Sequence, residues 1–378
     1  MSEPTSPSPF PHWMLREIFE QPAALSATIE QYVDGKRFRE ETCTELSNWI
    51  KEARGEIVIA ASGSSRHAGM VAELLLEDRS GIAVDVEYAS EYSYRSETAL
   101  KDASVLVISQ SGETVDTLSA LRKANTATHV TLAITNVAGS TIAKEATVSF
   151  PTCAGRERAV PATKSFTTQL LNLNLLSLIA AHVRGMMTDD ALEVALADVI
   201  ALPRMIERQL DSWKLAVKQI ATHYASAKTF LFLGRGVHYP IAREGALKLK
   251  ESSYLHAEAY PSGELKHGPN ALVNDDTPLV MIATVDRSDA ESVERYERVV
   301  QLMRDMQEQG ARILAIANVN DGTVTGLAHH TIYVEETSEA LLTICEVIPL
   351  QLFSYFMAVH QGIDVDHPRN LSKAVLAE

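Results

Sequence analysis

Short apolar runs that end in small polar residues, and are then followed by helical periodicity, recur along this chain. Residues 57–61 are all apolar and run into Ser-Gly-Ser-Ser, after which a helical pattern covers residues 67–76. Residues 105–108 are apolar and run into Ser-Gln-Ser-Gly-Glu-Thr, and another helical stretch follows. A buried strand, a small-residue turn and a helix form the opening of a parallel α/β unit. The pattern therefore predicts the α/β class.

The second half of the chain repeats this arrangement, about 170–185 residues further on. Apolar strands are expected at 229–233 and 279–283, and the long apolar stretch 339–362 corresponds to a predicted buried helix at 167–183. Each repeat is predicted to be a parallel sheet flanked by helices in three layers, with ligands at the carboxyl ends of the strands. The predicted organisation is a disordered Ser/Pro tail (1–11), N-terminal helices (12–45), a first α/β domain (46–188), a helical connector (189–224), a second α/β domain (225–365) and a C-terminal tail (366–378).

Charge and composition exclude several classes of protein. The net charge of -15 argues against general affinity for nucleic acid or anionic membranes. The cysteines are few, odd in number and widely spaced, so neither a disulfide framework nor a Cys–His metal cluster is expected, only buried free thiols. The N-terminus lacks the features of a secretory signal, and no uninterrupted apolar run is long enough to cross a membrane. These features indicate a cytoplasmic protein.

The loop at residues 109–114 is the strongest local signal for a ligand. It places three hydroxyls, an amide and a glycine between a strand and a helix. Because a helix N-terminus offers free N–H groups and partial positive charge, such a loop can bind a phosphate with neutral donors alone. The alternative is a helix cap with solvated serines. Neither a P-loop nor a dinucleotide fingerprint is present. The second repeat has carboxylates at 286–289 instead, which would repel phosphate and leave that repeat free for another task.

Candidate acid–base groups lie in the second repeat. Glu244, Lys248 and Glu251 fall on one face of a predicted helix, either as a solvated row of ion pairs or as part of a cleft. His267 stands in a Gly/Pro-bounded loop, where it could transfer protons or simply be structural. Lys373 in the C-terminal segment is either solvated or carried into the site. A phosphate loop with Glu, His and Lys fits proton transfer beside a carbonyl, which needs neither a metal nor a cofactor.

At this point several segments match a known family. The chain resembles, from about residue 12 to residue 378, the isomerase half of the glutamine–fructose-6-phosphate amidotransferase (glucosamine-6-phosphate synthase) family, a tandem sugar isomerase (SIS) fold. The matching segments are 12–22, 109–114, 233–251, 256–269 and 368–373.

The resemblance implies a role for each matched residue. It implies that Glu251 is the base that moves a proton between C1 and C2, with Lys248 beside it in the site. His267 would promote ring opening from the neighbouring subunit of a homodimer with a shared active site. Lys373 would form an imine with a keto sugar, and the tail 366–378 would close over the ligand, a hexose or hexosamine 6-phosphate. The residues implied to hold the sugar phosphate are Ser64, Ser65, Ser109, Gln110, Ser111 and Thr114.

Two departures from the family pattern bear on the reaction. The first cysteine is Cys43, and the residues before the first repeat are too few for the N-terminal glutaminase domain of the synthase. The family loop Val-Ala-Ser-Thr-Lys reads Val160-Pro161-Ala162-Thr163-Lys164 here, so a hydroxyl near the sugar is replaced at Ala162, while Val160 is kept. An alanine at this position is similar to SIS-type glucosamine-6-phosphate deaminases.

The sequence therefore favours a glucosamine-6-phosphate deaminase/isomerase that yields fructose 6-phosphate and ammonia. An alternative is a synthase that uses free ammonia or a separate glutaminase subunit, and the loop 263–267 follows the synthase pattern. A third alternative is a non-catalytic sugar-phosphate sensor, which the joint presence of Glu251, His267 and Lys373 disfavours.

Overall fold

The chain forms two compact units, each assembled from separate stretches of sequence. The structure, a computed structural model, describes residues 4–53, 55–96, 103–127 and 129–373. Because the chain passes between the units several times, neither unit is a single continuous segment, and the predicted domain boundaries remain a prediction. The first unit consists of residues 1–20, 158–163 and 204–371, and the second of residues 21–157, 164–203 and 372–378.

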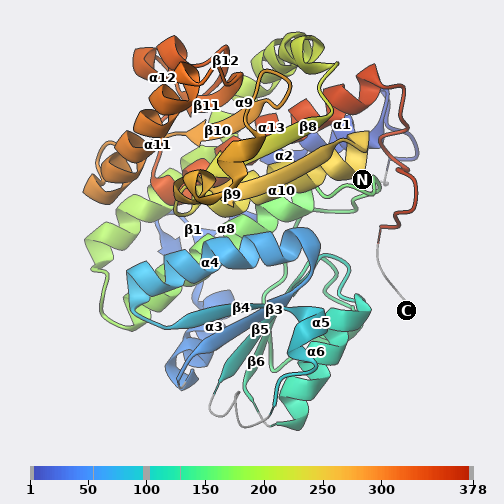
Figure 1. Cartoon of the computed structure of the whole chain (residues 1–378). Coiled ribbons are helices and arrows are strands. Elements are labelled where there is room, and N and C mark those ends of the chain that lie inside the picture. The colour runs from blue at the N-terminus through green and yellow to red at the C-terminus, as the bar shows by residue number, and fades with distance from the viewer. Residues whose placement is uncertain (1–3, 54, 97–102, 128, 374–378) are drawn as a thin grey trace. The chain divides into compact units, whose positions relative to one another are not determined.

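The second unit contains a five-stranded parallel sheet between two layers of helices (Figure 1). Its strands, in spatial order, are β4 (Val84–Tyr88), β3 (Ile57–Ala61), β5 (Ser104–Ser109), β6 (Thr131–Thr135) and β7 (Val148–Ser149). Buried apolar residues fill both faces of the central strands, as expected for a sheet that is covered on both sides. One face packs on α5 (Ala89–Tyr92), α6 (Val115–Thr126) and α7 (Thr141–Glu145), and the other on α4 (Gly63–Ser80), which packs on the buried α8 (Lys164–Val183).

The first unit contains a second parallel sheet with the same strand order, which confirms the predicted repeat of a three-layer α/β arrangement. Its strands, in spatial order, are β9 (His256–Pro261), β8 (Thr229–Gly234), β10 (Leu279–Ala283), β11 (Ile313–Asn318) and β12 (His330–Val334). One face packs on α11 (Ala290–Glu308) and α12 (Gly322–Leu327), and the other on α10 (His238–Ser253) and α13 (Glu339–His360).

The remaining helices match the predicted helical regions. The proline of the N-terminal region separates α1 (Trp13–Phe19) from α2 (Gln21–Tyr32), and α3 (Glu40–Glu52) follows a short hairpin of β1 (Val33–Asp34) and β2 (Arg37–Phe38). The helical connector is one helix, α9 (Asp189–Tyr224).

Three details differ from the sequence-based expectations. The hairpin β1–β2 and the edge strands β4 and β9 were not predicted, because edge strands lack the continuous apolar runs that mark the buried ones. Residues 4–11, predicted as part of a disordered tail, make specific contacts: the Arg16 guanidinium donates to the carbonyl oxygens of Ser6 and Ser8, and the Phe10 and Phe19 rings lie 4.9 Å apart.

Among the residues that the structure describes, two helices are long and apolar enough to cross a membrane, although polar residues interrupt the apolar run of each. They are α8 and α13, and 89% and 94% of their most apolar windows are buried inside the protein. Burial of this extent is typical of the core helices of a globular α/β protein, because a helix that is apolar all round needs neighbours on every side.

Candidate functional site

The serine loop, by which we mean residues 109–114, belongs to the second unit and forms a preorganised cup at the carboxyl end of β5. The Ser109 and Thr114 hydroxyl oxygens lie 2.9 Å apart, and the Ser109 hydroxyl oxygen accepts the N–H of Gly112 at 3.1 Å. The Ser111 hydroxyl oxygen accepts the N–H of Glu113 at 3.2 Å. Thr114 is the N-cap residue of α6 but makes no side-chain capping bond. The loop therefore holds its hydroxyls at the positive end of a helix, as a phosphate site requires.

Strand register brings two of the other predicted phosphate ligands to the same edge of the sheet. β3 and β5 are hydrogen-bonded neighbours, with Ala61 opposite Ile108. Ser64 and Ser65 therefore lie in the first turn of α4, at the same sheet edge as the serine loop, and both are partly exposed. Gln110, also partly exposed, completes the set of six residues that the sequence assigned to the phosphate. Their binding role remains a prediction.

The segment that carries Val160 and Ala162 belongs to the first unit and is fixed by buried carboxyl and carbonyl groups. The Glu17 carboxylate, 1% exposed, accepts the N–H groups of Arg158 and Ala159 at 2.5 and 3.2 Å. The Val160 N–H donates to the carbonyl oxygen of Asp366 at 3.1 Å. Sequence reasoning missed Glu17, although a carboxylate on the apolar face of α1 was a readable signal. These bonds fix the backbone of the strap, by which we mean residues 158–163.

The row of charged side chains on α10, Glu244, Lys248 and Glu251, is largely buried. The Lys248 ammonium lies 2.5 Å from a Glu251 carboxylate oxygen and 3.4 Å from a Glu244 oxygen, and the Lys248 and Glu244 side chains are 1% and 0% exposed. Burial alone would lower the pKa of Lys248, but the two carboxylates outweigh it and raise that pKa above its ordinary value. The solvated alternative is thus wrong for Glu244 and Lys248. Glu251, whose side chain is 21% exposed, is the member of the row that reaches solvent.

His267 is not joined to that row. It is the last residue of a 3₁₀ segment, η2 (Ser262–His267), and its side chain is exposed. Among the residues that the structure describes, it makes no hydrogen bond or ion pair, whereas its neighbour Lys266 pairs with Asp305. A ring in this position is available to a partner molecule. Its role in ring opening from a neighbouring subunit remains a prediction.

Lys373, in contrast, has a specific partner within the second unit. Its ammonium lies 2.5 Å from a carboxylate oxygen of Glu157, whose side chain is 0% exposed. Burial would raise the pKa of Glu157, but Lys373 and the hydrogen bonds from Ser165 lower it to about 2. Sequence reasoning missed Glu157, because its partner is 216 residues away along the chain. The structure therefore contradicts the alternative in which the Lys373 side chain is simply solvated.

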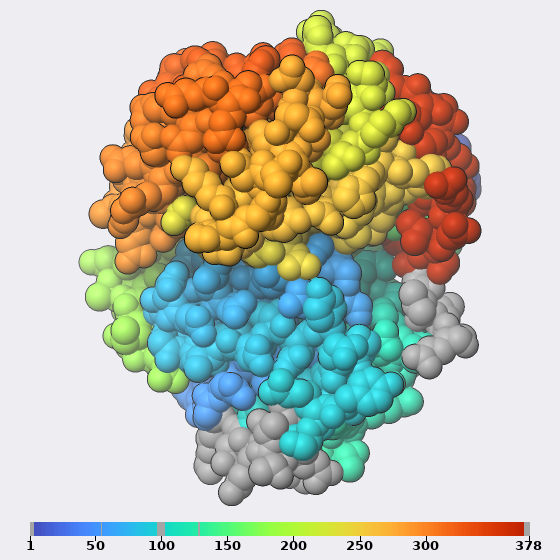
Figure 2. All heavy atoms as spheres, in the orientation of Figure 1, coloured from blue at the N-terminus to red at the C-terminus, as the bar shows by residue number. Residues whose placement is uncertain are grey.

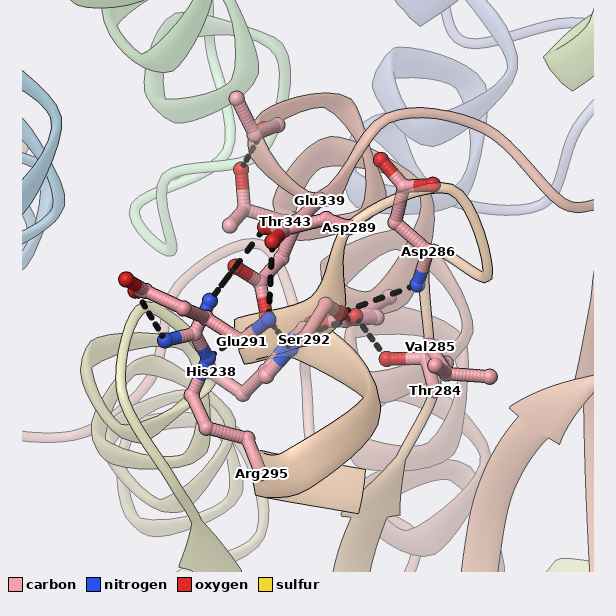
Figure 3. Close-up of polar contacts among 12 residues, drawn as sticks. His238, Thr284, Val285, Asp286, Asp289, Glu291, Ser292, Arg295, Glu339 and Thr343 are labelled. Atoms are coloured by element: carbon pink, nitrogen blue, oxygen red, sulfur yellow. Dashed lines mark hydrogen bonds and ion pairs between the residues drawn. The ribbon is translucent and has the colours of Figure 1, made fainter. Parts of the chain in front are cut away.

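The sheet of the first unit carries, at its carboxyl edge, a network of charged side chains that the sequence did not predict (Figure 3). His238 lies 2.9 Å from Glu346 and 3.3 Å from Glu339, and Arg295 pairs with Glu339 at 2.5 Å. Thr284 donates to Glu346 at 2.5 Å. Burial alone would lower the pKa of His238, but Glu346 and Glu339 outweigh it and raise that pKa to about 10. Arg295 also lies 3.6 Å from Asp289 and 3.4 Å from Glu291, so the two cations of the network face four carboxylates.

The neighbouring carboxylates of this edge are used by the backbone. Asp289 caps α11 by accepting the N–H of Glu291 at 2.9 Å, and Asp286 accepts the N–H of Ser288 at 2.9 Å. Figure 3 shows Asp286 apart from the pairs made by Arg295. These carboxylates thus bond to backbone N–H groups of their own loop, and the expectation that the first repeat binds the anion remains a prediction.

In the part of the chain that the structure describes, no group of three or more His, Cys, Asp or Glu side chains is arranged so that it could hold a metal ion. The three cysteines are free, with Cys43 and Cys345 buried and Cys153 partly buried. Burial raises the pKa of all three thiols. The prediction of buried free thiols is thus met by Cys43 and Cys345, whereas Cys153 is free but only partly buried.

Comparison with known proteins places this geometry in a family. The family model of the SIS domain matches residues 50–179 and 223–361, one match on each sheet. The chain belongs to the SIS domain family. Its two SIS domains are the two α/β repeats described above.

Related proteins extend the match across almost the whole chain. It is 39% identical to a glutamine–fructose-6-phosphate aminotransferase (isomerizing) of Chlorobaculum tepidum, over 98% of this chain and 59% of the relative. It is 41% identical to that of Pseudomonas putida, over 97% of this chain and 59% of the relative. This chain thus spans about three fifths of the curated relatives. The solved C-terminal domain of glucosamine–fructose-6-phosphate aminotransferase from Francisella tularensis is 34% identical, with a TM-score of 0.88, over 97% of this chain and 100% of that one. The resemblance to the isomerase half is confirmed.

More distant structures share the fold alone. A glucosamine-6-phosphate deaminase of Thermotoga maritima is 24% identical with a TM-score of 0.69, over 96% of this chain and 99% of that one. A tagatose-6-phosphate ketose/aldose isomerase of Escherichia coli is 18% identical with a TM-score of 0.76, over 98% and 100%.

Proposed function

We propose that this chain interconverts glucosamine 6-phosphate with fructose 6-phosphate and ammonia, by moving a proton between C1 and C2 of the open-chain sugar. The observation that carries the proposal is the buried row on α10. It holds one partly exposed carboxylate, Glu251, against the buried Lys248 ammonium. A carboxylate fixed in this way is suited to take and return a proton beside a carbonyl.

In the proposed reaction, the phosphate binds at the serine loop 109–114 and at Ser64 and Ser65. His267, supplied by the partner in a homodimer, promotes ring opening. Glu251 takes the C2 proton of the open-chain amino aldose and returns it to C1, which gives a ketimine. Water then adds to C2 and ammonia leaves. Lys373 forms an imine with the keto sugar at the same carbon.

Two directions of this reaction have separate support. The 39% and 41% identities to aminotransferases favour amination of fructose 6-phosphate, with ammonia from solution or from a glutaminase partner. Deamination, the direction that the sequence favoured, is supported by Ala162, where the synthase loop carries a serine. The kinship to metabolic sugar-phosphate enzymes also supports a cytoplasmic location.

The test is an assay in both directions with the purified chain. Glucosamine 6-phosphate is supplied and ammonia release is measured, and separately fructose 6-phosphate and ammonium are supplied and the amino sugar is measured. Product in the first assay alone supports deamination, and product in the second alone supports amination. Sugar-phosphate binding without turnover in either assay would identify a sensor instead and overturn the proposal.

A substitution tests the base. Glu251→Gln keeps the size of the side chain but cannot accept a proton, so turnover should fall roughly 10²–10⁴-fold. Glu207→Gln, the same chemical change at an exposed position of α9, should leave turnover unchanged. Full turnover in Glu251→Gln would defeat the assignment.

A further inference from the structure

The carboxylate of Glu157 is held by hydrogen bonds that do not involve Lys373. One oxygen accepts the N–H of Ser165 at 3.0 Å, and the other accepts the Ser165 hydroxyl at 2.6 Å. Ser165 lies in the first turn of α8, a helix of 20 residues, so the carboxylate also sits at the positive end of a helix dipole. The position of this charge is therefore set by the core of the second unit.

Lys373 supplies the cation that this buried charge requires. A carboxylate without exposure to water is unfavourable unless it is paired and hydrogen-bonded. The Lys373 side chain is 25% exposed and lies on the C-terminal segment, which runs over the surface in red in Figure 2. A long side chain on such a segment has many conformations, and the ion pair selects the one in which the ammonium meets Glu157 at 2.5 Å.

We infer that Glu157 is the positioning residue for Lys373, holding its amino group in place before the sugar arrives and throughout imine formation. The inference rests on the proposed function for the role of the imine, whereas the ion pair itself needs no substrate. In the sequence, Glu157 directly precedes the strap, on which Val160 and Ala162 are the predicted sugar contacts.

The charge balance of imine formation explains why a fixed carboxylate is useful. The ammonium has three protons; when its nitrogen replaces the carbonyl oxygen at C2, two of them leave with that oxygen as water and one stays on the iminium. The nitrogen is cationic before and after the step. Glu157 can therefore remain ionised and pair with the same nitrogen throughout, and no other acid or base is consumed overall.

The ion pair is tested first, without any sugar. The purified chain is treated with an acetylating reagent, and the labelling rate of Lys373 is measured by mass spectrometry relative to the exposed Lys250. Glu157→Gln should raise this ratio at least about fivefold, because a charged hydrogen bond is lost. Glu207→Gln should leave it unchanged. An unchanged ratio in Glu157→Gln overturns the inference.

A second, milder variant keeps the test decisive if the first one does not fold. Ser165→Ala removes the hydroxyl donor but keeps the Glu157 charge, and it should raise the labelling ratio by a smaller factor. If Glu157→Gln does not fold, an unchanged ratio in folded Ser165→Ala overturns the inference by itself.

Kinetics then separates positioning from simple stability. In whichever direction the wild-type chain turns over, Glu157→Gln should lower kcat about 10–100-fold, because the amine is no longer held near its target. KM should change little, because the serine loop is untouched. A raised KM with unchanged kcat overturns the positioning role. Absence of turnover in the wild type would defeat the proposed function, but the labelling result would still decide whether Glu157 holds Lys373.

Discussion

Gly112 has a backbone conformation that other residues adopt with difficulty, and it lies at the centre of the serine loop. Its φ is 66°, and a Cβ added there would lie 2.0 Å from the Ser140 hydroxyl oxygen. Gly81 has a similar φ of 65° at the end of α4, but open space around it. A substitution at Gly81 therefore tests backbone strain alone, whereas a substitution at Gly112 adds a steric clash.

At Gly112 an alanine should damage the anion cup. Gly112→Ala is expected to weaken hexose-phosphate binding roughly tenfold or more, because the loop must move away from Ser140 and misalign its donors. Gly81→Ala should destabilise the fold by about 1–2 kcal/mol and leave binding unchanged. Calorimetric titration with fructose 6-phosphate and thermal melts measure both effects. Equal binding by the two variants would contradict the proposal that the serine loop binds the phosphate.

The elements show where sequence patterns are informative and where they fail. The central strands of both sheets were predictable, because continuous buried runs such as residues 57–61 have few alternatives. The edge strand β9 was not, since its sequence His-Ala-Glu-Ala-Tyr-Pro has neither an apolar run nor high strand propensity. The α10 row was recognisable from its helical spacing. Glu157 and Glu346 were not, because each has its cationic partner more than 100 residues away along the chain.

The charge network that joins α10, α11 and α13 should make stability depend on pH in a defined way. Because the folded pKa of His238, about 10, is above the unfolded value of 6.5, its pairing contributes full stability below about pH 6.5 and loses it as pH rises towards 10. The pKa of Glu339 is lowered to about 2, so its pairing acts in the opposite sense. It contributes fully above about pH 4.5 and loses its contribution as pH falls towards 2.

Replacing the histidine tests this dependence. His238→Gln should lower the free energy of unfolding by about 3–5 kcal/mol near pH 6, because it leaves the buried Glu346 carboxylate without its cation. The difference from wild type should shrink between pH 7 and pH 10. Denaturant unfolding at several pH values measures it, and a difference that is constant over this range would contradict the assignment.

At the scale of the whole molecule, the open question is whether two chains share each site. An exposed His267 without a partner among the described residues suits a role in trans. If each site takes Glu251 from one subunit and His267 from the other, a heterodimer of Glu251→Gln with His267→Ala has one intact site. It should show about half of the wild-type activity.

The reciprocal pairing provides the control. A heterodimer of wild type with the double variant Glu251→Gln/His267→Ala should be inactive if the site is shared, but about half active if each chain is self-sufficient. Heterodimers isolated with two different affinity tags give both values in one assay. The pair of results distinguishes the arrangements even if one variant retains residual turnover.

The interleaved chain path also has a consequence for synthesis on the ribosome. Helix α1 belongs to the first unit, whose chain continues with the short segment 158–163 and then only from residue 204, and its first N–H groups bond to Asp366. At about 5–20 residues per second, translation needs on the order of 10–40 s to reach residue 204 after α1 has been made. During that interval Met14 and Ile18, both 0% exposed in the finished protein, lack helix α13, on which α1 packs. The nascent chain therefore presents an exposed apolar helix that a chaperone can recognise, and α1 reaches its final packing only once Asp366 has been made.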